Sequence, residues 1–230
     1  MNDNTAPTPR PARNPGRPQR RRRGPATAAS QPARAPSHPV LARLADLYPT
    51  LFGETPRPLK RGIYADLLAA QGDIDAEGLK AALALHTRST RYLSSVAAGM
   101  ARHDLQGQAV EAMAPEHVLH ALLEVHRRRQ ARSQEDLRPK LRQRIVQAFE
   151  ASGLSREDYA ALLPSRDPAI RELFEQALDE AAVRAAKDAA LHRAYSASGL
   201  EPDAFAAGYG LPAAEVRRML ERVKRRSQQV

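Results

Sequence analysis

The sequence predicts a mostly α-helical protein, and three features of its composition and pattern indicate this fold class. Hydrophobic residues make up 42% of the 230 residues but aromatic residues only 4%, without any tryptophan, so the core must consist mainly of alanine, leucine and valine. Side chains of this kind suit closely packed helices and disfavour an aromatic-rich β-sandwich. Beyond about residue 38, apolar residues recur at helical spacing, and proline or glycine residues separate the resulting helices.

The part of the chain that follows the N-terminal region predicts three helices. Apolar residues from Val40 onward predict a first helix, which Pro49 ends. Pro58 is well placed to open a second helix, because proline suits the first helical turn, and Gly72 ends it. Asp75 is a suitable N-cap for a third helix, since its carboxylate can accept hydrogen bonds from the first backbone N–H groups.

The next part predicts a further helix, a small hairpin and one more helix. Thr87 is a candidate N-cap for the helix that carries Tyr92. Between residues 96 and 110 the helical period disappears and two glycines occur, which favours a short hairpin or an irregular loop. Pro115 then suits the first turn of a helix that runs to Arg129.

An internal repeat follows, and its two copies align without gaps at an offset of 46 residues. The first copy, VQAFEASGLSREDYAALLPSRDPAIRELFEQAL from Val146, matches HRAYSASGLEPDAFAAGYGLPAAEVRRMLERVK from His192. Each copy predicts a helix, a turn, a short helix, a second turn and a helix, with Gly153 and Gly199 ending the first helices. We therefore expect an all-α domain made of two similar helical units at residues 135–226, suited to protein interaction or self-association.

Residues 1–36 carry most of the positive charge. They hold eight arginines, one acidic residue and eight prolines, and so account for seven of the ten net positive charges. Because this region has almost no apolar periodicity to offset chain entropy, we predict a disordered tail rich in arginine and proline. The run Arg20–Arg23 favours contact with nucleic acid through counterion release, without sequence readout. A tail that only increases solubility is the alternative.

The composition and the missing motifs exclude several kinds of function. The chain has no cysteine, which rules out disulfides, thiolate zinc sites and cysteine nucleophiles. No apolar run reaches the roughly 18 residues of a membrane-spanning helix and no signal peptide is recognisable, so we expect a soluble cytoplasmic protein without a membrane partner. No phosphate-binding glycine loop, nucleophile elbow or zinc-protease motif occurs, so we expect no enzyme and no cofactor. His117 and His120 lack a further ligand cluster, and we expect no bound metal.

Two blocks of sequence give a more specific indication. They are RPLKRGIYADLL at residues 57–68 and LKAALALHTRSTRYLSSVAAGMARHDLQG at residues 79–107, which contains a Thr-x-Ser-x-Arg-Tyr-Leu pattern from Thr87 to Leu93. In this order and at these separations, the blocks resemble the ProQ/FinO family of RNA-binding proteins. The likeness extends over roughly residues 38–130.

The resemblance implies a mostly helical ProQ/FinO-like domain with a small β-hairpin, and it implies the activity of an RNA chaperone. The implied partners are structured RNAs, namely small regulatory RNAs and messenger RNA 3′ ends that carry a terminator hairpin and a single-stranded 3′ tail. Binding of this kind affects RNA stability or RNA–RNA pairing in post-transcriptional regulation.

The resemblance also assigns RNA-binding positions. Tyr92 and Arg102 match the family's pocket pair, and Thr87 with Ser89 matches the helix start that faces the RNA end. Basic residues before, within and after this helix start complete the expected surface. The full set of expected RNA-binding residues is Arg57, Lys60, Arg61, Lys80, Thr87, Arg88, Ser89, Arg91, Tyr92 and Arg102.

The chemistry of these residue types agrees with such roles. A helix N-terminus offers unpaired N–H groups and the positive end of the helix dipole, which suits a phosphate beside Ser89. Arg102 can donate parallel hydrogen bonds to a phosphate or a base edge, and Tyr92 can stack on an unpaired base or bond to a ribose oxygen. On spacing alone, Tyr92 is better explained as a core aromatic residue, and the basic residues individually as solvated helix residues.

A DNA-binding transcriptional regulator is the alternative function. The closing segment YGLPAAEVRRMLERVKRR, from Tyr209, has the spacing of a helix-turn-helix. Its second helix is expected to expose Arg217, Arg218 and Arg222. Two glutamates interrupt this basic surface, and the chain from residue 135 onward is nearly neutral, which disfavours the alternative.

Overall fold

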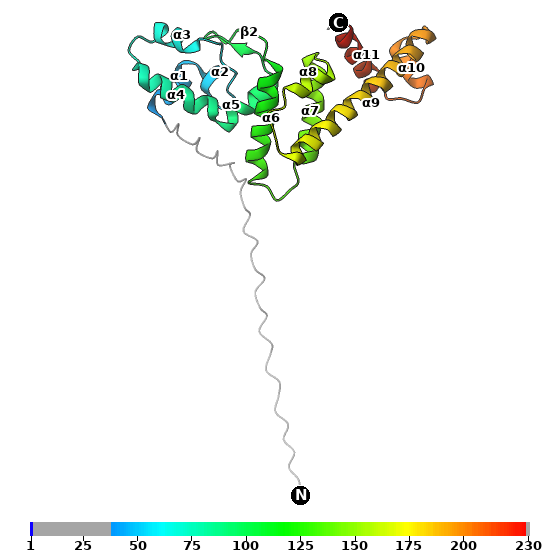
Figure 1. The fold of residues 1–230 in the computed structure, drawn as a ribbon, viewed down its shortest axis with the longest axis horizontal. Helices are drawn as coiled ribbons and strands as arrows, with labels where there is room; N and C mark the ends of the chain where they lie inside the picture. Colours follow the sequence, from blue (N-terminus) through cyan, green and yellow to red (C-terminus); the bar gives the residue numbers. More distant parts are fainter. Residues whose placement is uncertain (2–37, 229–230) are drawn as a thin grey trace. The chain divides into compact units, whose positions relative to one another are not determined.

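The computed structural model describes Met1 and residues 38–228 (Figure 1). Apart from Met1, the predicted disordered tail at residues 1–36 lies outside the described residues. Within them the chain forms eleven helices and one two-stranded antiparallel hairpin, which confirms the mostly α-helical fold class. None of the described helices is both long and apolar enough to cross a lipid bilayer.

The secondary structure falls into two consecutive groups. The first group is α1 (Pro39–Leu47), α2 (Pro49–Phe52), α3 (Ile63–Ala70), α4 (Ala76–Arg88), α5 (Thr90–Ala97), β1 (Arg102–His103), β2 (Ala109–Glu111) and α6 (Pro115–Gln130). The second group is α7 (Arg138–Ser152), α8 (Arg156–Ala161), α9 (Pro168–Ser198), α10 (Pro202–Gly208) and α11 (Ala213–Ser227).

Local signals in the sequence place several of these helix ends correctly. Pro115 occupies the first turn of α6, as expected. Asp75 caps α4 by accepting a hydrogen bond of 2.6 Å from the N–H of Gly78. Pro49 follows the end of α1, and it also opens the short helix α2.

One expected helix start is wrong. Pro58 does not open a helix, because residues 58–60 run beside β1 instead. The N–H of His103 donates to the carbonyl oxygen of Pro58 at 2.7 Å, and the N–H of Lys60 donates to the carbonyl oxygen of His103 at 2.8 Å. The next helix, α3, begins only after Gly62, which turns the chain with a φ of +78°, a conformation that favours glycine.

β1 and β2 form the predicted hairpin. They pair in antiparallel register, with Arg102 opposite Glu111. In the connection, the Asp104 carboxylate accepts two backbone N–H bonds, at 3.0 and 2.8 Å, and Gly107 has a φ of +75°. The hairpin thereby places Arg102 beside the extended segment that follows Pro58.

One hydrophobic core extends from α1 to the first half of α9. Fully buried members include Leu44 in α1, Leu119 in α6 and Phe174 in α9. α6 packs against both α5 and α7, so it lies between the two groups of elements. A second, smaller cluster around Phe205 holds α10 and α11 to the end of α9. A domain boundary near residues 130–135 stays a prediction.

The two expected helical units share the 31-residue helix α9 (Figure 1). The first unit consists of α7, α8 and the first half of α9, and the second consists of the remainder of α9 with α10 and α11. Gly153 and Gly199, which are equivalent in the repeat, end their helices with φ values of +69° and +63°. The hydroxyls of Ser152 and Ser198 each donate to a carbonyl oxygen at 2.7 Å. These matching helix ends agree with two similar units.

α10, a short turn and α11 have the order of a helix-turn-helix, but two of the three arginines expected on its exposed face are engaged. Arg217 forms an ion pair of 2.6 Å with Asp203. Arg222 donates two hydrogen bonds to Asp188, which is 4% exposed. Both arginines serve contacts within the unit, so the fold offers little support for groove readout by α11.

Candidate nucleic-acid interface

Two side chains from different elements meet at the backbone of Leu59, in the extended segment beside β1. The N–H of Leu59 donates a hydrogen bond of 3.0 Å to the hydroxyl oxygen of Tyr92 on α5. The carbonyl oxygen of Leu59 accepts a hydrogen bond of 3.1 Å from Nη1 of Arg102 on β1. The structure thus brings Tyr92 and Arg102 to one residue, where together they hold the basic segment around Leu59 in place.

Tyr92 is 6% exposed and belongs to the core. Its ring packs edge-on against His86, with 5.2 Å between the ring centroids. Burial raises the pKa of the Tyr92 hydroxyl despite the opposing effects of the Leu59 N–H and the Arg102 charge, so the hydroxyl keeps its proton at neutral pH. Because so little of the ring is exposed, Tyr92 is better placed to position Leu59 than to stack on a base.

Arg102 is also largely buried. Its side chain is 15% exposed, and its Nε lies 4.0 Å from the carboxylate of Glu111 on β2. This Nε is buried and makes no hydrogen bond within the part of the chain that the structure describes. A guanidinium has five N–H donors, so Arg102 has capacity for an acceptor beyond the carbonyl oxygen of Leu59.

The start of α5 lies one helical turn before Tyr92, and Ser89 caps it. The hydroxyl oxygen of Ser89 accepts a hydrogen bond of 3.2 Å from the N–H of Tyr92. The preceding N–H groups of a helix have no partner within the helix, and together with the helix dipole they favour an anion at this end. Arg88 and Arg91, on either side of Ser89 in sequence, are exposed. This end of α5 therefore combines a hydroxyl, backbone N–H groups without a partner in the helix, and two cations.

Thr87 is not the cap that the sequence suggests. It lies in the last turn of α4, and its hydroxyl donates a hydrogen bond of 2.8 Å to the carbonyl oxygen of Leu83. Lys80 lies on the same face of α4, two turns before Thr87 and about 10.5 Å away along the axis. The Lys80 side chain is 71% exposed. Thr87 and Lys80 therefore extend the basic surface along α4 rather than completing the start of α5.

The cations of the segment at residues 57–61 are held by partners in α3 and in the hairpin. Lys60 forms an ion pair of 2.7 Å with Asp66, and Arg61 forms one of 3.0 Å with Glu111. Arg57 donates a hydrogen bond of 3.2 Å to the carbonyl oxygen of Gly107. Ion pairs between half-exposed or exposed side chains are weak, so phosphates can exchange with these carboxylates.

Sequence reasoning missed Arg128 on α6. Its Nη1 donates to the carbonyl oxygen of Arg88 at 2.7 Å and to the Thr90 hydroxyl at 3.2 Å, so it fixes the corner between α4 and α5. Its Nε donates to Glu124 at 2.6 Å. Hydrogen bonds from Arg127, with those from Arg128, lower the pKa of Glu124 to about 2, so the carboxylate is ionised. The sequence feature that could have indicated Arg128 is the run of three arginines at the end of α6.

The larger cavities of the described residues lie away from Leu59. One, of about 440 Å³, lies between the end of α5 and α7 and includes Arg144, while another, of about 650 Å³, lies between α6 and the loop before α9. Among the residues that the structure describes, no group of three or more histidines and carboxylates is arranged for a metal ion. The candidate interface is therefore a basic surface formed by the residue 57–61 segment, the hairpin and the start of α5.

Comparison with known proteins identifies relatives of this part of the chain. Residues 34–138 match the model of the ProQ/FINO family. The RNA chaperone ProQ of Shewanella oneidensis is 42% identical over 88 residues, which cover 36% of this chain and 41% of that protein. The RNA chaperone ProQ of Aeromonas salmonicida is 40% identical over 91 residues, covering 37% of this chain and 43% of that protein. The chain thus spans about two fifths of the length of these curated relatives.

A solved structure also matches. It is a FinO-like RNA chaperone from Neisseria meningitidis, with 33% sequence identity over 36% of this chain and 85% of that chain, at a TM-score of 0.34. Neither of the two curated relatives is described as a DNA-binding regulator.

Proposed function

We propose that this protein, whose residues 34–138 match the model of the ProQ/FINO family, is an RNA chaperone that binds structured RNA. Its substrates are small regulatory RNAs and messenger RNA 3′ ends, and binding affects RNA stability or RNA–RNA pairing in post-transcriptional regulation. The observation that carries the proposal is that Tyr92 and Arg102 both form hydrogen bonds with the backbone of Leu59. These bonds fix a basic segment beside the start of α5. The curated relatives, which are RNA chaperones, support it.

The single-stranded 3′ tail binds at the start of α5. A terminal phosphate accepts hydrogen bonds from the first backbone N–H groups of the helix and from the Ser89 hydroxyl. The exposed side chains of Arg88 and Arg91 add positive charge on both sides of this point. Tyr92 and Arg102 act mainly as positioning residues, because each is largely buried and bonded to Leu59.

The base of the hairpin binds along the basic surface. A-form RNA has a deep, narrow major groove that side chains cannot read, so recognition relies on backbone phosphates and shape. Arg57, Lys60, Arg61 and Lys80 supply phosphate contacts, and phosphates replace the carboxylates of Asp66 and Glu111. Sequence readout is weak, and remodelling of RNA in this way needs no catalytic group.

A comparison of two RNA probes tests the proposal. The full chain is titrated with a hairpin that carries a single-stranded 3′ oligouridine tail and with the same hairpin cut at the base of the stem. We expect tighter binding of the tailed hairpin, because only that probe has a single-stranded 3′ end that can reach the start of α5. Equal affinities for the two probes would contradict the site. Equally tight binding of a DNA duplex of the same sequence would instead support the DNA-binding alternative.

A further inference from the structure

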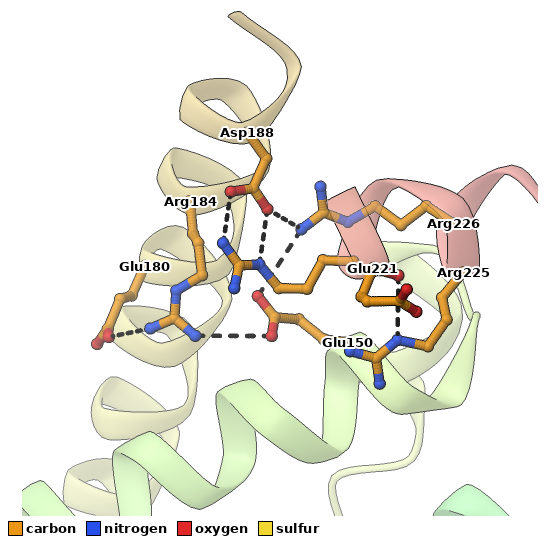
Figure 2. Close-up of polar contacts among 8 residues, drawn as sticks. Glu150, Glu180, Arg184, Asp188, Glu221, Arg225 and Arg226 are labelled. Carbon is orange, nitrogen blue, oxygen red and sulfur yellow. Dashed lines mark hydrogen bonds and ion pairs between the residues drawn. The ribbon is translucent and has the colours of Figure 1, made fainter. Parts of the chain in front are cut away.

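A network of charged side chains joins α7, α9 and α11 (Figure 2). Asp188 on α9, which is 4% exposed, accepts hydrogen bonds from Arg222 at 2.7 and 2.9 Å and from Arg226 at 3.0 Å. Glu150 on α7 lies 3.9 Å from Arg226 and 3.6 Å from Arg184. The network therefore holds α11 against the second half of α9 and against the end of α7.

The repeat places an equivalent ion pair in each unit, but the acidic and the basic residue have exchanged positions between the two units. In the first unit, Arg142 on α7 forms an ion pair of 3.3 Å with Glu180 on α9. The equivalent residues 46 positions later are Asp188 and Arg226, which pair at 3.0 Å. The contact is thus preserved in place while its acid and its base have exchanged helices.

The reversal extends beyond this pair along the third helix of each unit. At the three equivalent positions, α9 carries Gln176, Asp179 and Glu180, whereas α11 carries Arg222, Arg225 and Arg226. The pairing with Asp188 requires Arg222 and Arg226 but makes no use of the third arginine. In the first unit, Asp179 is paired with Arg156 at 2.7 Å, and the residue equivalent to Arg156 in the second unit is a proline. The charge of Arg225 is therefore not explained by packing of the unit.

The three arginines line a notch between α7 and α11. Its volume is about 140 Å³, and its other lining residues are Gln147, Glu150 and Ala151. Arg225 is exposed and has no carboxylate within ion-pair distance among the residues that the structure describes; its Nε donates only to the carbonyl oxygen of Glu221, at 3.4 Å (Figure 2).

Donors remain available at this notch. Asp188 uses Nε and Nη2 of Arg222 and only Nη2 of Arg226, and a guanidinium has five N–H donors. The residues that line the notch include three arginines but only one carboxylate, that of Glu150. A small tetrahedral anion therefore finds several guanidinium donors and an excess of positive charge here.

We infer that this notch binds a backbone phosphate of RNA and so gives the chain a second RNA contact outside residues 34–138. The inference rests on the proposed function, because it assigns this contact to the same structured RNA. Arg225 makes the principal contact, while Arg222 and Arg226 are positioned by Asp188. Glu150 faces the same notch and opposes the phosphate.

Binding of the tailed hairpin RNA to full-chain variants tests the inference. Arg225→Gln is expected to lower affinity by about three- to tenfold, as for one charge-assisted hydrogen-bonding contact that is partly exposed to solvent. The slope of log affinity against log salt concentration is expected to fall by about 1. Arg171→Gln is the matched control, since it removes the same charge from an exposed position on the corresponding helix of the first unit, and we expect it to change affinity by less than about twofold.

Glu150→Gln adds a test of opposite sign. This substitution keeps the size of the side chain but removes the charge that opposes the phosphate, so we expect higher affinity. A purely structural role for the cluster would make Glu150→Gln and Arg225→Gln change affinity in the same direction, and that result would overturn the inference. Equal effects of Arg225→Gln and Arg171→Gln would also overturn it.

Two further comparisons separate the possible sources of failure. If the parent chain does not bind the tailed hairpin, the proposed function fails and the inference fails with it; if the parent binds and Arg225→Gln binds equally well, the inference alone fails. The Nε–Hε resonance of Arg225 is then followed by NMR during titration with inorganic phosphate and with the RNA. We expect both to shift it, whereas a shift with inorganic phosphate alone would show a site for free phosphate and overturn the RNA contact.

Discussion

Replacing Ser89 with aspartate separates the capping role of this residue from its proposed role in binding RNA. Aspartate is as good an N-cap as serine, and a negative charge at a helix N-terminus stabilises the helix by about 0.3–1 kcal/mol. Ser89→Asp should therefore leave α5 folded, with its side chain still accepting the N–H of Tyr92. The same charge would face any phosphate bound at this end of the helix.

The size of the effect follows from Coulomb's law. A carboxylate and a phosphate charge about 4 Å apart repel each other by about 1 kcal/mol in bulk water and by about 4 kcal/mol at the effective dielectric of a protein surface. We therefore expect Ser89→Asp to weaken binding of a hairpin with a 3′ tail by about fivefold or more. The loss should become smaller as salt concentration rises.

The assay is a fluorescence anisotropy titration of labelled hairpin RNA at several salt concentrations. Ser155→Asp is the matched control, because Ser155 caps α8 in the same way, accepting the N–H of Asp158 at 3.0 Å. Circular dichroism verifies that both variants remain folded. If Ser89→Asp binds RNA as tightly as the parent, or if both variants lose affinity equally, no phosphate is held at the start of α5.

Three further results are expected. Deletion of residues 1–36 should flatten the salt dependence of RNA binding without abolishing the preference for the tailed hairpin, because we expect the arginines of this region to contact phosphates without sequence readout. Loss of the preference in a titration would show that the folded domain does not recognise the tailed hairpin. Burial lowers the pKa of His86 from its ordinary 6.5 to about 4, so as the pH falls the unfolded chain takes up a proton before the folded chain does. The free energy of unfolding in urea should therefore fall by about 2 kcal/mol between pH 7 and pH 5, and His86→Leu should remove most of this fall; an unchanged fall in the variant would contradict the assignment. The Tyr159 hydroxyl is buried and has no hydrogen-bond partner among the residues that the structure describes, so Tyr159→Phe should raise the free energy of unfolding by about 1 kcal/mol; a loss of stability would contradict this assignment. Phe205 already occupies the equivalent position in the second unit.

Local signals allowed much of the secondary structure to be predicted. Asp75 and Pro115 act within one helical turn of their own positions, and the structure places them as expected. Pro58 has the same local suitability for a helix start, yet the chain there pairs with β1, more than forty residues later. A pairing over that separation has no local signature, so the error could not be corrected from the sequence around Pro58.

The candidate site shows the same limit. Thr87 and Ser89 are both suitable N-caps by residue type and lie only two residues apart. The sequence pattern alone therefore does not decide which of them caps α5. The outcome depends on where α4 ends, and Arg128 fixes that corner from a helix forty residues away. The sequence also marked Tyr92 and Arg102 as a pair without indicating that both bond to Leu59.

Periodicity, capping residues and ordered motifs lie in neighbouring positions, so the helical composition, the hairpin, the internal repeat and the match of residues 34–138 to a family model follow from the amino-acid sequence alone. Which charged groups are paired follows only from the fold. Tyr92 and Arg102 reach a residue 33 and 43 positions away, and Arg222 reaches Asp188 over 34 positions. A hydrogen bond or ion pair depends on a separation of a few ångströms, and that separation is set by how helices pack rather than by how residues follow one another.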